Sequence, residues 1–174
     1  MKPPDQWFSE NGHRDTSWKC AADRLPSRDA LVYYRTALYR FAGYIDLYRR
    51  AAEQFGTTAH PVGMHSPGFI ANTDEEARNL HWPHYRVIRD RIGALRGWPP
   101  IRQEEYEREI EHGSLYIGSP ETVARKIADA VKALGVGRFD LIYTAGAQPI
   151  SARMRAVELY GTKVIPMVHD ILAG

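Results

Sequence analysis

Residues 118–145 decide the fold, and they read GSPETVARKIADAVKALGVGRFDLIYTA. Ser119 followed by Pro120 is a strong helix start, because a serine oxygen can cap free amides and proline suits the first helical position. Apolar residues then recur at helical spacing up to Gly135, at Val123, Ile127, Ala130, Val131 and Leu134. In the run 138–145, apolar residues occur at both odd and even positions, which is typical of a parallel strand covered on both faces. The stretch therefore predicts an α/β fold with parallel strands.

A long amphipathic helix is predicted to start at Asp29 and to stop at Gly56. Glycine there suits the left-handed backbone that closes many helices. The apolar residues of the helix alternate between spacings of three and four: Leu31, Tyr34, Leu38, Phe41, Ile45, Tyr48, Ala52 and Phe55. Together with an open parallel sheet, this broad stripe exceeds what one small domain can cover, so we expect a homo-oligomer, most simply a dimer.

A buried strand is predicted at 61–71, where small, β-branched and aromatic residues lie between prolines and glycines. Thr73 and Glu76 follow as a capping box, in which the threonine oxygen accepts from the Glu76 amide and Glu76 reaches back to the Thr73 amide. The helix that begins there is expected to kink or restart at Pro83 and to end near Gly97.

Three shorter features complete the pattern. Residues 103–111 predict a charged helix that is largely solvated, with little apolar surface beyond Tyr106 and Ile110. Residues 115–117 predict a short extended piece. A helix over 151–160 is expected to end at Gly161.

The length of 174 residues argues against a complete eight-stranded barrel, which typically takes about 250. With 44% hydrophobic and 25% charged residues, the composition is that of one globular domain. Residues 1–28 show no helical or strand period and predict an irregular N-terminal arm. The remaining residues, 29–174, predict a single α/β domain.

Charge and cysteine content exclude several classes of protein. A net charge of +2 gives no concentrated field for a phosphate backbone, so no nucleic-acid partner is expected. The single cysteine, Cys20, excludes an intramolecular disulfide. The N-terminus lacks an apolar signal segment, and no run approaches the roughly 18 apolar residues of a membrane span. We therefore expect a cytoplasmic protein with no membrane partner.

Metal and phosphate motifs are weak in this sequence. His81 and His84 stand at helical spacing, but Pro83 between them disturbs the geometry and no HExxH or CxxC pattern accompanies them, so no metal site is predicted. Neither glycine-rich phosphate loop, GxGxxG or GxxxxGK[ST], occurs.

Several stretches together resemble the C-terminal part of the luciferase-like, flavin-dependent monooxygenases. The similarity covers roughly residues 36–168 and rests on segments 48–53 (YRRAAE), 62–71 (VGMHSPGFIA), 73–78 (TDEEAR), 118–130 (GSPETVARKIADA), 134–141 (LGVGRFDL) and 155–166 (RAVELYGTKVIP). Members of this family are (β/α)₈ barrels that bind a reduced flavin, usually FMN or the deazaflavin F420, at the C-terminal ends of the strands. The resemblance thus implies a partial, truncated TIM-barrel-like arrangement of a few parallel strands with long helices, not a closed eight-stranded barrel.

The candidate cofactor-binding residues are those expected at the C-terminal strand ends: His65, Ser66, Tyr143, Thr144 and Gly146. His65 could bond a flavin or transfer a proton, Thr144 offers a hydroxyl, and Gly146 allows close backbone approach. A structural interpretation stands beside each of these: a histidine in a purely structural hydrogen bond, and a packed strand end with a glycine turn.

Two functions follow. The first is a truncated flavin-dependent monooxygenase or other oxidoreductase, whose catalytic competence as a single chain is in question because the N-terminal strands of the family have no counterpart here. The second is a non-catalytic, oligomerising protein derived from such a barrel. With few strand ends and no phosphate loop, flavin binding is expected to be weak or absent.

Overall fold

The computed structural model describes residues 30–144 and 146–174, with side chains from Phe41 onward. The predicted N-terminal arm, residues 1–28, lies outside the described residues. The elements are α1 (Ala30–Gln54), β1 (Gly63–Ile70), α2 (Asp74–Arg96), α3 (Gln103–His112), β2 (Tyr116–Gly118), α4 (Pro120–Leu134), β3 (Arg138–Ile142), α5 (Ile150–Leu159), the π-helical turn η3 (Tyr160–Val164) and α6 (Ile165–Ala173).

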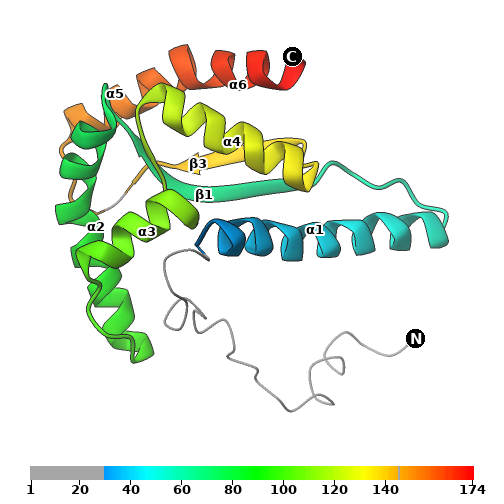
Figure 1. The fold of residues 1–174 in the computed structure, drawn as a ribbon, viewed down its shortest axis with the longest axis horizontal. Helices are drawn as coiled ribbons and strands as arrows, with labels where there is room; N and C mark the ends of the chain where they lie inside the picture. The colour runs from blue at the N-terminus through cyan, green and yellow to red at the C-terminus, as the bar shows by residue number, and fades with distance from the viewer. Residues whose placement is uncertain (1–29, 145) are drawn as a thin grey trace.

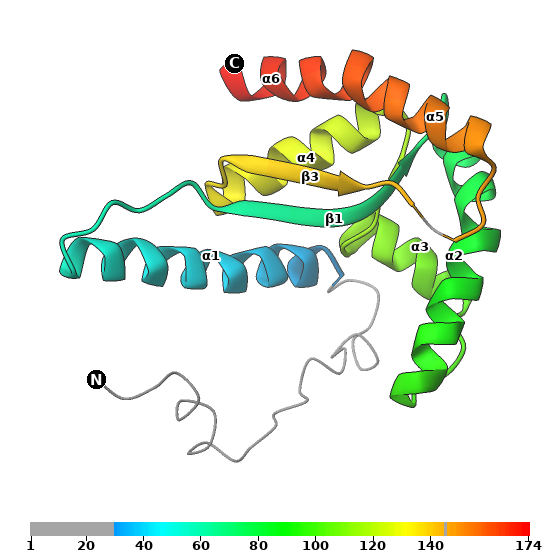
Figure 2. The same ribbon diagram turned by 180° about the vertical axis from the view of Figure 1, so that it is seen from behind.

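The three described strands form one parallel sheet in the order β2-β1-β3 (Figures 1 and 2). The N-terminal half of β1 pairs with β3, from Gly63 opposite Arg138 to Pro67 opposite Ile142. Its C-terminal half pairs with β2, from Gly68 opposite Tyr116 onward. Three such strands cannot close a barrel. The prediction of a partial, open α/β arrangement is therefore confirmed.

One face of the sheet is covered by helices. Side chains alternate between faces along a strand, and Met64 and Ile70 of β1 point to the same side as Phe139 and Leu141 of β3. On that side they pack against α4 and α6, which lie side by side (Figure 1). The core there is aliphatic, and its buried members include Val123, Ala124, Ile127, Ala130, Leu159, Val164 and Val168.

The other face is covered only near the C-terminal end of β1. There Phe69 packs into a second core beneath α2 and α3, with Ile117 and Tyr106. The N-terminal half of this face is open, and Figure 2 shows β1 and β3 with no described helix in front of them. Ile142 is 42% exposed as a result. The expectation that residues 138–145 are covered on both faces is therefore wrong, because nothing among the described residues packs on this side of β3.

The helix ends follow the local sequence signals. The Thr73 Oγ1 accepts a hydrogen bond from the Glu76 amide at 3.1 Å, as predicted. The Glu76 carboxylate instead accepts from the amide of Asn72, one residue before the cap, at 3.0 Å. Gly97 closes α2 with a left-handed φ of 70°. The helix between them contains Pro83 and does not restart there.

Two helical predictions need correction. The charged helix α3 is not a solvated excursion, because Tyr106 is 0% exposed and Ile110 is buried beside it in the core. The helix after β3 does not end at Gly161, since α5 continues through η3 into α6. We attribute the wide η3 turn to Pro166, which cannot donate to the carbonyl of Thr162 and crowds that turn.

Asp74 joins the starts of two helices. Its carboxylate accepts from the Ser119 amide at 2.6 Å and from the Thr122 hydroxyl at 3.0 Å, so the first turn of α2 is tied to the first turn of α4. Partial burial raises the pKa of Asp74, but the bonds from Ser119 and Thr122 outweigh it, and the net pKa is lowered. The carboxylate is therefore held in its charged form.

We expect Asp74→Ala to lower the free energy of unfolding by about 2 kcal/mol, because the partly buried Ser119 amide and the Thr122 hydroxyl lose their acceptor. Chemical denaturation followed by circular dichroism measures this. Glu75→Ala is the matched control on the exposed side of the same turn and should change stability little. Equal effects of the two variants would contradict the assigned role of Asp74.

Candidate functional site

A polar group of side chains lies on the open face of the sheet. His65 is the register partner of Asp140 on the neighbouring strand, so both side chains stand on the same face. The Arg138 Nε donates to both Asp140 oxygens, at 2.9 and 3.0 Å. This arrangement places an imidazole, a carboxylate and a guanidinium together where the sheet faces solvent. These exposed groups can bond a ligand or bridge to another polypeptide.

His65 and Ser66 do not act as a pair. Both lie in the first half of β1, not at its C-terminal end, and they point to opposite faces because they are consecutive in a strand. His65 is exposed. Ser66 is buried, and its hydroxyl donates to the carbonyl of Ser114 at 2.7 Å. The serine therefore has a structural hydrogen bond in this fold.

The three candidate residues after β3 fall in different surroundings. Tyr143 lines a groove of about 240 Å³ beside α5, and Thr144 is exposed. Gly146 has a left-handed φ of 65°, and a Cβ there would lie 2.9 Å from the Ile88 side chain of α2. The close approach that this glycine allows is to a helix of the same chain. The structure thus brings none of the five candidates into one enclosed pocket.

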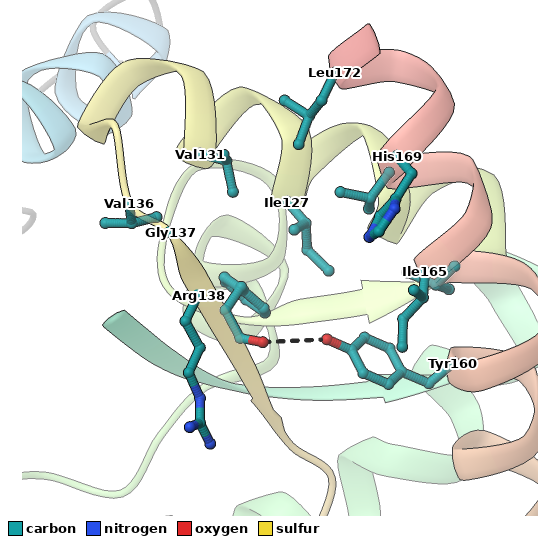
Figure 3. Close-up of a pocket in the computed structure, with 12 residues that line it drawn as sticks. Ile127, Val131, Val136, Gly137, Arg138, Tyr160, Ile165, His169 and Leu172 are labelled. Carbon is teal, nitrogen blue, oxygen red and sulfur yellow. Dashed lines mark hydrogen bonds between the residues drawn. The ribbon is translucent and has the colours of Figure 1, made fainter. Parts of the chain in front are cut away.

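A second groove, of about 310 Å³, adjoins the same edge of β3 (Figure 3). Its walls come from α4, η3 and α6, and its lining is mainly aliphatic, including Ile127, Val131, Ile165 and Leu172. The Tyr160 hydroxyl donates to the Phe139 carbonyl at 3.4 Å, as the dashed line in Figure 3 shows. Burial, with the charge of Asp140 adding to it, raises the pKa of Tyr160.

The sequence analysis did not single out Arg138 and Asp140, because it treated both faces of their strand as apolar. The signal was present: these two charged residues alternate with Phe139 and Leu141, which is the period of a strand with one polar face. It also missed Asn72, which follows β1. The Asn72 Oδ1 accepts from Arg155 of α5 at 2.9 Å, a contact between residues distant in the sequence.

A buried aromatic cluster surrounds His81. The histidine is 2% exposed, its Nδ1 lies 3.0 Å from the Tyr106 hydroxyl, and its ring stacks on Tyr85 at 5.2 Å between centroids. Burial, and then the charge of His84, lowers the pKa of His81 to about 4. Burial raises the pKa of Tyr85 to about 12. His81 is thus a neutral packing residue at pH 7, and no group of metal-ligating side chains occurs in the described part of the chain.

Lys126 also has a perturbed pKa, which burial lowers to about 8. Its Nζ donates to the carbonyls of Ile110 at 2.6 Å and Leu115 at 2.9 Å, and it lies over the Tyr116 ring. These contacts join α4 to the end of α3. The lysine therefore has a structural role in the described fold.

Two solved monooxygenases share this fold over part of their length. The monooxygenase RslO1 from Streptomyces bottropensis matches with a TM-score of 0.62 and 18% identity over 80% of this chain and 44% of that one. The oxygenating constituent of 3,6-diketocamphane monooxygenase from Pseudomonas putida, a type II Baeyer-Villiger monooxygenase solved with FMN, matches with a TM-score of 0.55 and 20% identity over 78% and 45%. The resemblance to flavin-dependent monooxygenases is therefore confirmed for the fold.

This chain spans less than half the length of either matched structure. No protein-family model and no curated protein sequence matches it. Among the described residues, no helix has the length and apolar character needed to cross a membrane.

The described residues fit a flavin only in part. In the first turns of α2 and α4, the amides of Glu76 and Thr122 already donate to the Thr73 and Ser119 side chains, so each capped turn has one amide fewer for a phosphate. The first turn of α5, after β3, has no side-chain cap, so its amides point to where an anion could be held. The open face beside His65 is not enclosed by the described residues.

Proposed function

We propose that the protein is a flavin-dependent oxidoreductase of the monooxygenase type in truncated form, which supplies one part of a flavin site. The observation that carries this proposal is the fold shared over 78% of the chain with a monooxygenase solved with FMN. The open sheet face supports the proposal that this chain supplies only one part of the site. A flavin site needs walls that exclude water, and this face has none among the described residues.

Three groups of this chain are suited to the flavin, which would be FMN or F420. The uncapped first turn of α5 would hold the phosphate through its amides. The exposed Thr144 hydroxyl and the exposed His65 imidazole stand at separate points along the sheet, and each would offer one hydrogen bond to the flavin. When bound, the reduced ring supplies hydride or activates oxygen. The chain's own part is to orient the ring and, at His65, to hold or move a proton.

The alternative is a non-catalytic, oligomerising protein derived from the same fold. The favouring observation is the amount of apolar surface left exposed on α1 and directly after it, where Phe41, Tyr44 and Phe55 are each at least 60% exposed. A chain that has lost its flavin site but kept such a surface would act through association alone.

Flavin titration separates the two functions. We expect no co-purified flavin and a dissociation constant for FMN no better than roughly micromolar, about −8 kcal/mol, followed by quenching of flavin fluorescence. Riboflavin, which lacks the phosphate, should bind more weakly than FMN. His65→Ala and Thr144→Val should each weaken FMN binding about tenfold, because each removes one hydrogen bond to the flavin.

His60→Ala and Thr162→Val are the matched controls, since both side chains are exposed and lie outside the proposed flavin contacts. Control variants that weaken binding as much as His65→Ala would place the flavin elsewhere. No quenching at about a hundred times the expected dissociation constant would favour the non-catalytic alternative. Nanomolar binding abolished by both site variants would instead indicate a complete site in this chain.

A further inference from the structure

The C-terminal half of α2 projects away from the sheet, as both ribbon views show (Figures 1 and 2). Its outer side carries apolar residues in solvent: Leu95 is 85% exposed, Val87 is 63% exposed and Ile92 is 40% exposed. Val87, Arg91 and Leu95 are four residues apart and therefore form one row along the helix. Ile92 and Arg96 form the adjacent row. We call these five residues the α2 tip.

The tip is basic because its arginines are not balanced by acidic residues. Residues 86–98 contain four arginines and a single acidic residue, Asp90. The Asp90 carboxylate accepts a hydrogen bond from the Ile101 amide at 2.7 Å. Among the residues that the structure describes, no ion pair involves Arg91 or Arg96. Their positive charge is therefore available to an anionic partner.

Trp98 holds two arginines at the end of the helix. The centre of its ring lies 4.5 Å from the guanidinium carbon of Arg89 and 5.1 Å from that of Arg96. Stacking on an aromatic ring orders a guanidinium group without neutralising its charge. Tryptophan is also enriched where proteins meet lipid headgroups, because its ring is apolar and its N–H is polar. The end of α2 thus presents ordered positive charge beside an aromatic ring.

The combination of charged and apolar side chains indicates the chemistry of the partner. A nucleic acid would offer phosphates to the arginines but would leave Leu95 in water. An anionic bilayer offers both contacts at once: headgroup phosphates for the arginines, and the acyl boundary just below them for Leu95 and Val87. A fluid bilayer also adapts to a projecting helix end, whereas a folded protein would need a matching hollow.

We propose that the α2 tip is a contact surface for an anionic lipid bilayer, on which the protein rests without crossing it. Arg91 and Arg96 bind headgroup phosphates, and Leu95, Val87 and Ile92 enter the acyl boundary. Such a contact needs neither a signal segment nor a spanning helix, the two features whose absence led us to expect no membrane partner. Vesicle binding is measured without flavin, so this proposal and the proposed function can fail separately.

Co-sedimentation of the full chain with lipid vesicles tests the proposal. We expect binding to phosphatidylcholine vesicles with about 30% phosphatidylglycerol to be at least about tenfold stronger than binding to pure phosphatidylcholine vesicles. The difference should shrink in about 1 M salt, which screens the arginines. Leu95→Gln, and the double variant Arg91→Gln with Arg96→Gln, should each weaken binding to the anionic vesicles about tenfold. Circular dichroism should show unchanged helix content, because these side chains are exposed.

Matched controls make the same chemical changes elsewhere. Leu47→Gln on α1, where Leu47 is 56% exposed, should bind vesicles as the wild type does. So should the double variant Arg108→Gln with Arg125→Gln, which removes two exposed arginines from α3 and α4. Equal binding to the two kinds of vesicle, or equal weakening by the controls, would overturn the proposal.

Two further outcomes would also overturn it. Weaker binding in the arginine variant alone would mean that the tip contacts phosphates without entering the bilayer. Binding of duplex DNA in place of the anionic vesicles would identify the partner as a nucleic acid.

Discussion

Replacing Gly68 by alanine is expected to lower the free energy of unfolding by about 3 kcal/mol or more. A Cβ at this position would overlap both the Tyr116 carbonyl and the Leu141 side chain. Leu141 could change its rotamer, but the Tyr116 carbonyl is backbone of the adjacent strand β2. One methyl group would therefore push β1 and β2 apart at the centre of the sheet.

Urea unfolding followed by circular dichroism measures this effect, and Gly43→Ala provides the matched control. Gly43 lies inside α1 with nothing within 4 Å of an added Cβ, so alanine there should raise stability by about 0.5–1 kcal/mol. The same chemical change is thus expected to have opposite signs at the two positions. A Gly68→Ala variant within about 0.5 kcal/mol of the wild type would contradict the close packing of the two strands.

Acid is expected to destabilise the protein by up to about 3 kcal/mol through His81 alone. The folded pKa of about 4 lies below the ordinary value of 6.5, so the unfolded chain binds more protons between these values. Stability should therefore fall as the pH drops from 6.5 to 4. The groups that face His81 are neutral or apolar, namely Tyr106 from α3, Phe69 from β1 and Tyr85 on its own helix, and His84 nearby adds repulsion.

The double variant His81→Phe with Tyr106→Phe isolates this contribution. Removing both partners leaves neither side chain with an unmade hydrogen bond to the other, so the free energy of unfolding at pH 7 should change little. Unfolding free energies are measured in urea across the same pH range, and the wild type should lose about 3 kcal/mol more than the double variant. Parallel losses in the two proteins would mean that the pKa of His81 is not lowered in the folded state, so that the histidine takes up its proton there as readily as in the unfolded chain.

Local signals in the sequence predicted much of the fold. The Thr73 and Ser119 caps and the glycines at 97 and 135 each act within a few residues, so their effect can be inferred without tertiary structure. The strand at 63–70 and the parallel arrangement followed from its apolar run and from the helices around it. The partial architecture followed from length, because too few strands are present for closure.

The errors involve contacts between distant residues. Tyr106 is the sole aromatic residue in a charged stretch, and only the arrival of α2, with His81 and Tyr85, makes it a core residue. Gly161 has the sequence of a helix stop, but Leu159 and Val164 on either side of it are buried against α4, so the helix continues. Tertiary packing overrides local propensity in both cases.

The candidate site also depends partly on local sequence signals and partly on contacts between distant residues. The sequence predicted Tyr143 and Thr144 within a strand over 138–145, whereas β3 ends at Ile142, so the surroundings of these residues depend on how far each strand extends. β1 continues three residues beyond its pairing with β3, so His65 lies away from the strand end and beside Asp140. These positions depend on the face to which a strand residue points, on the length of the strand and on the neighbouring helices. Only the first of these can be inferred from the sequence.

The ion pair of Arg138 and Asp140 affects how this sheet can grow. Among the described residues β3 has a neighbour on one side only, and a bare strand edge invites other strands in solution to add to it. β3 is only five residues long and carries both charges of this pair. A short, charged edge strand is a poor template for another strand, so the same two residues that make the open face polar also oppose uncontrolled extension of the sheet.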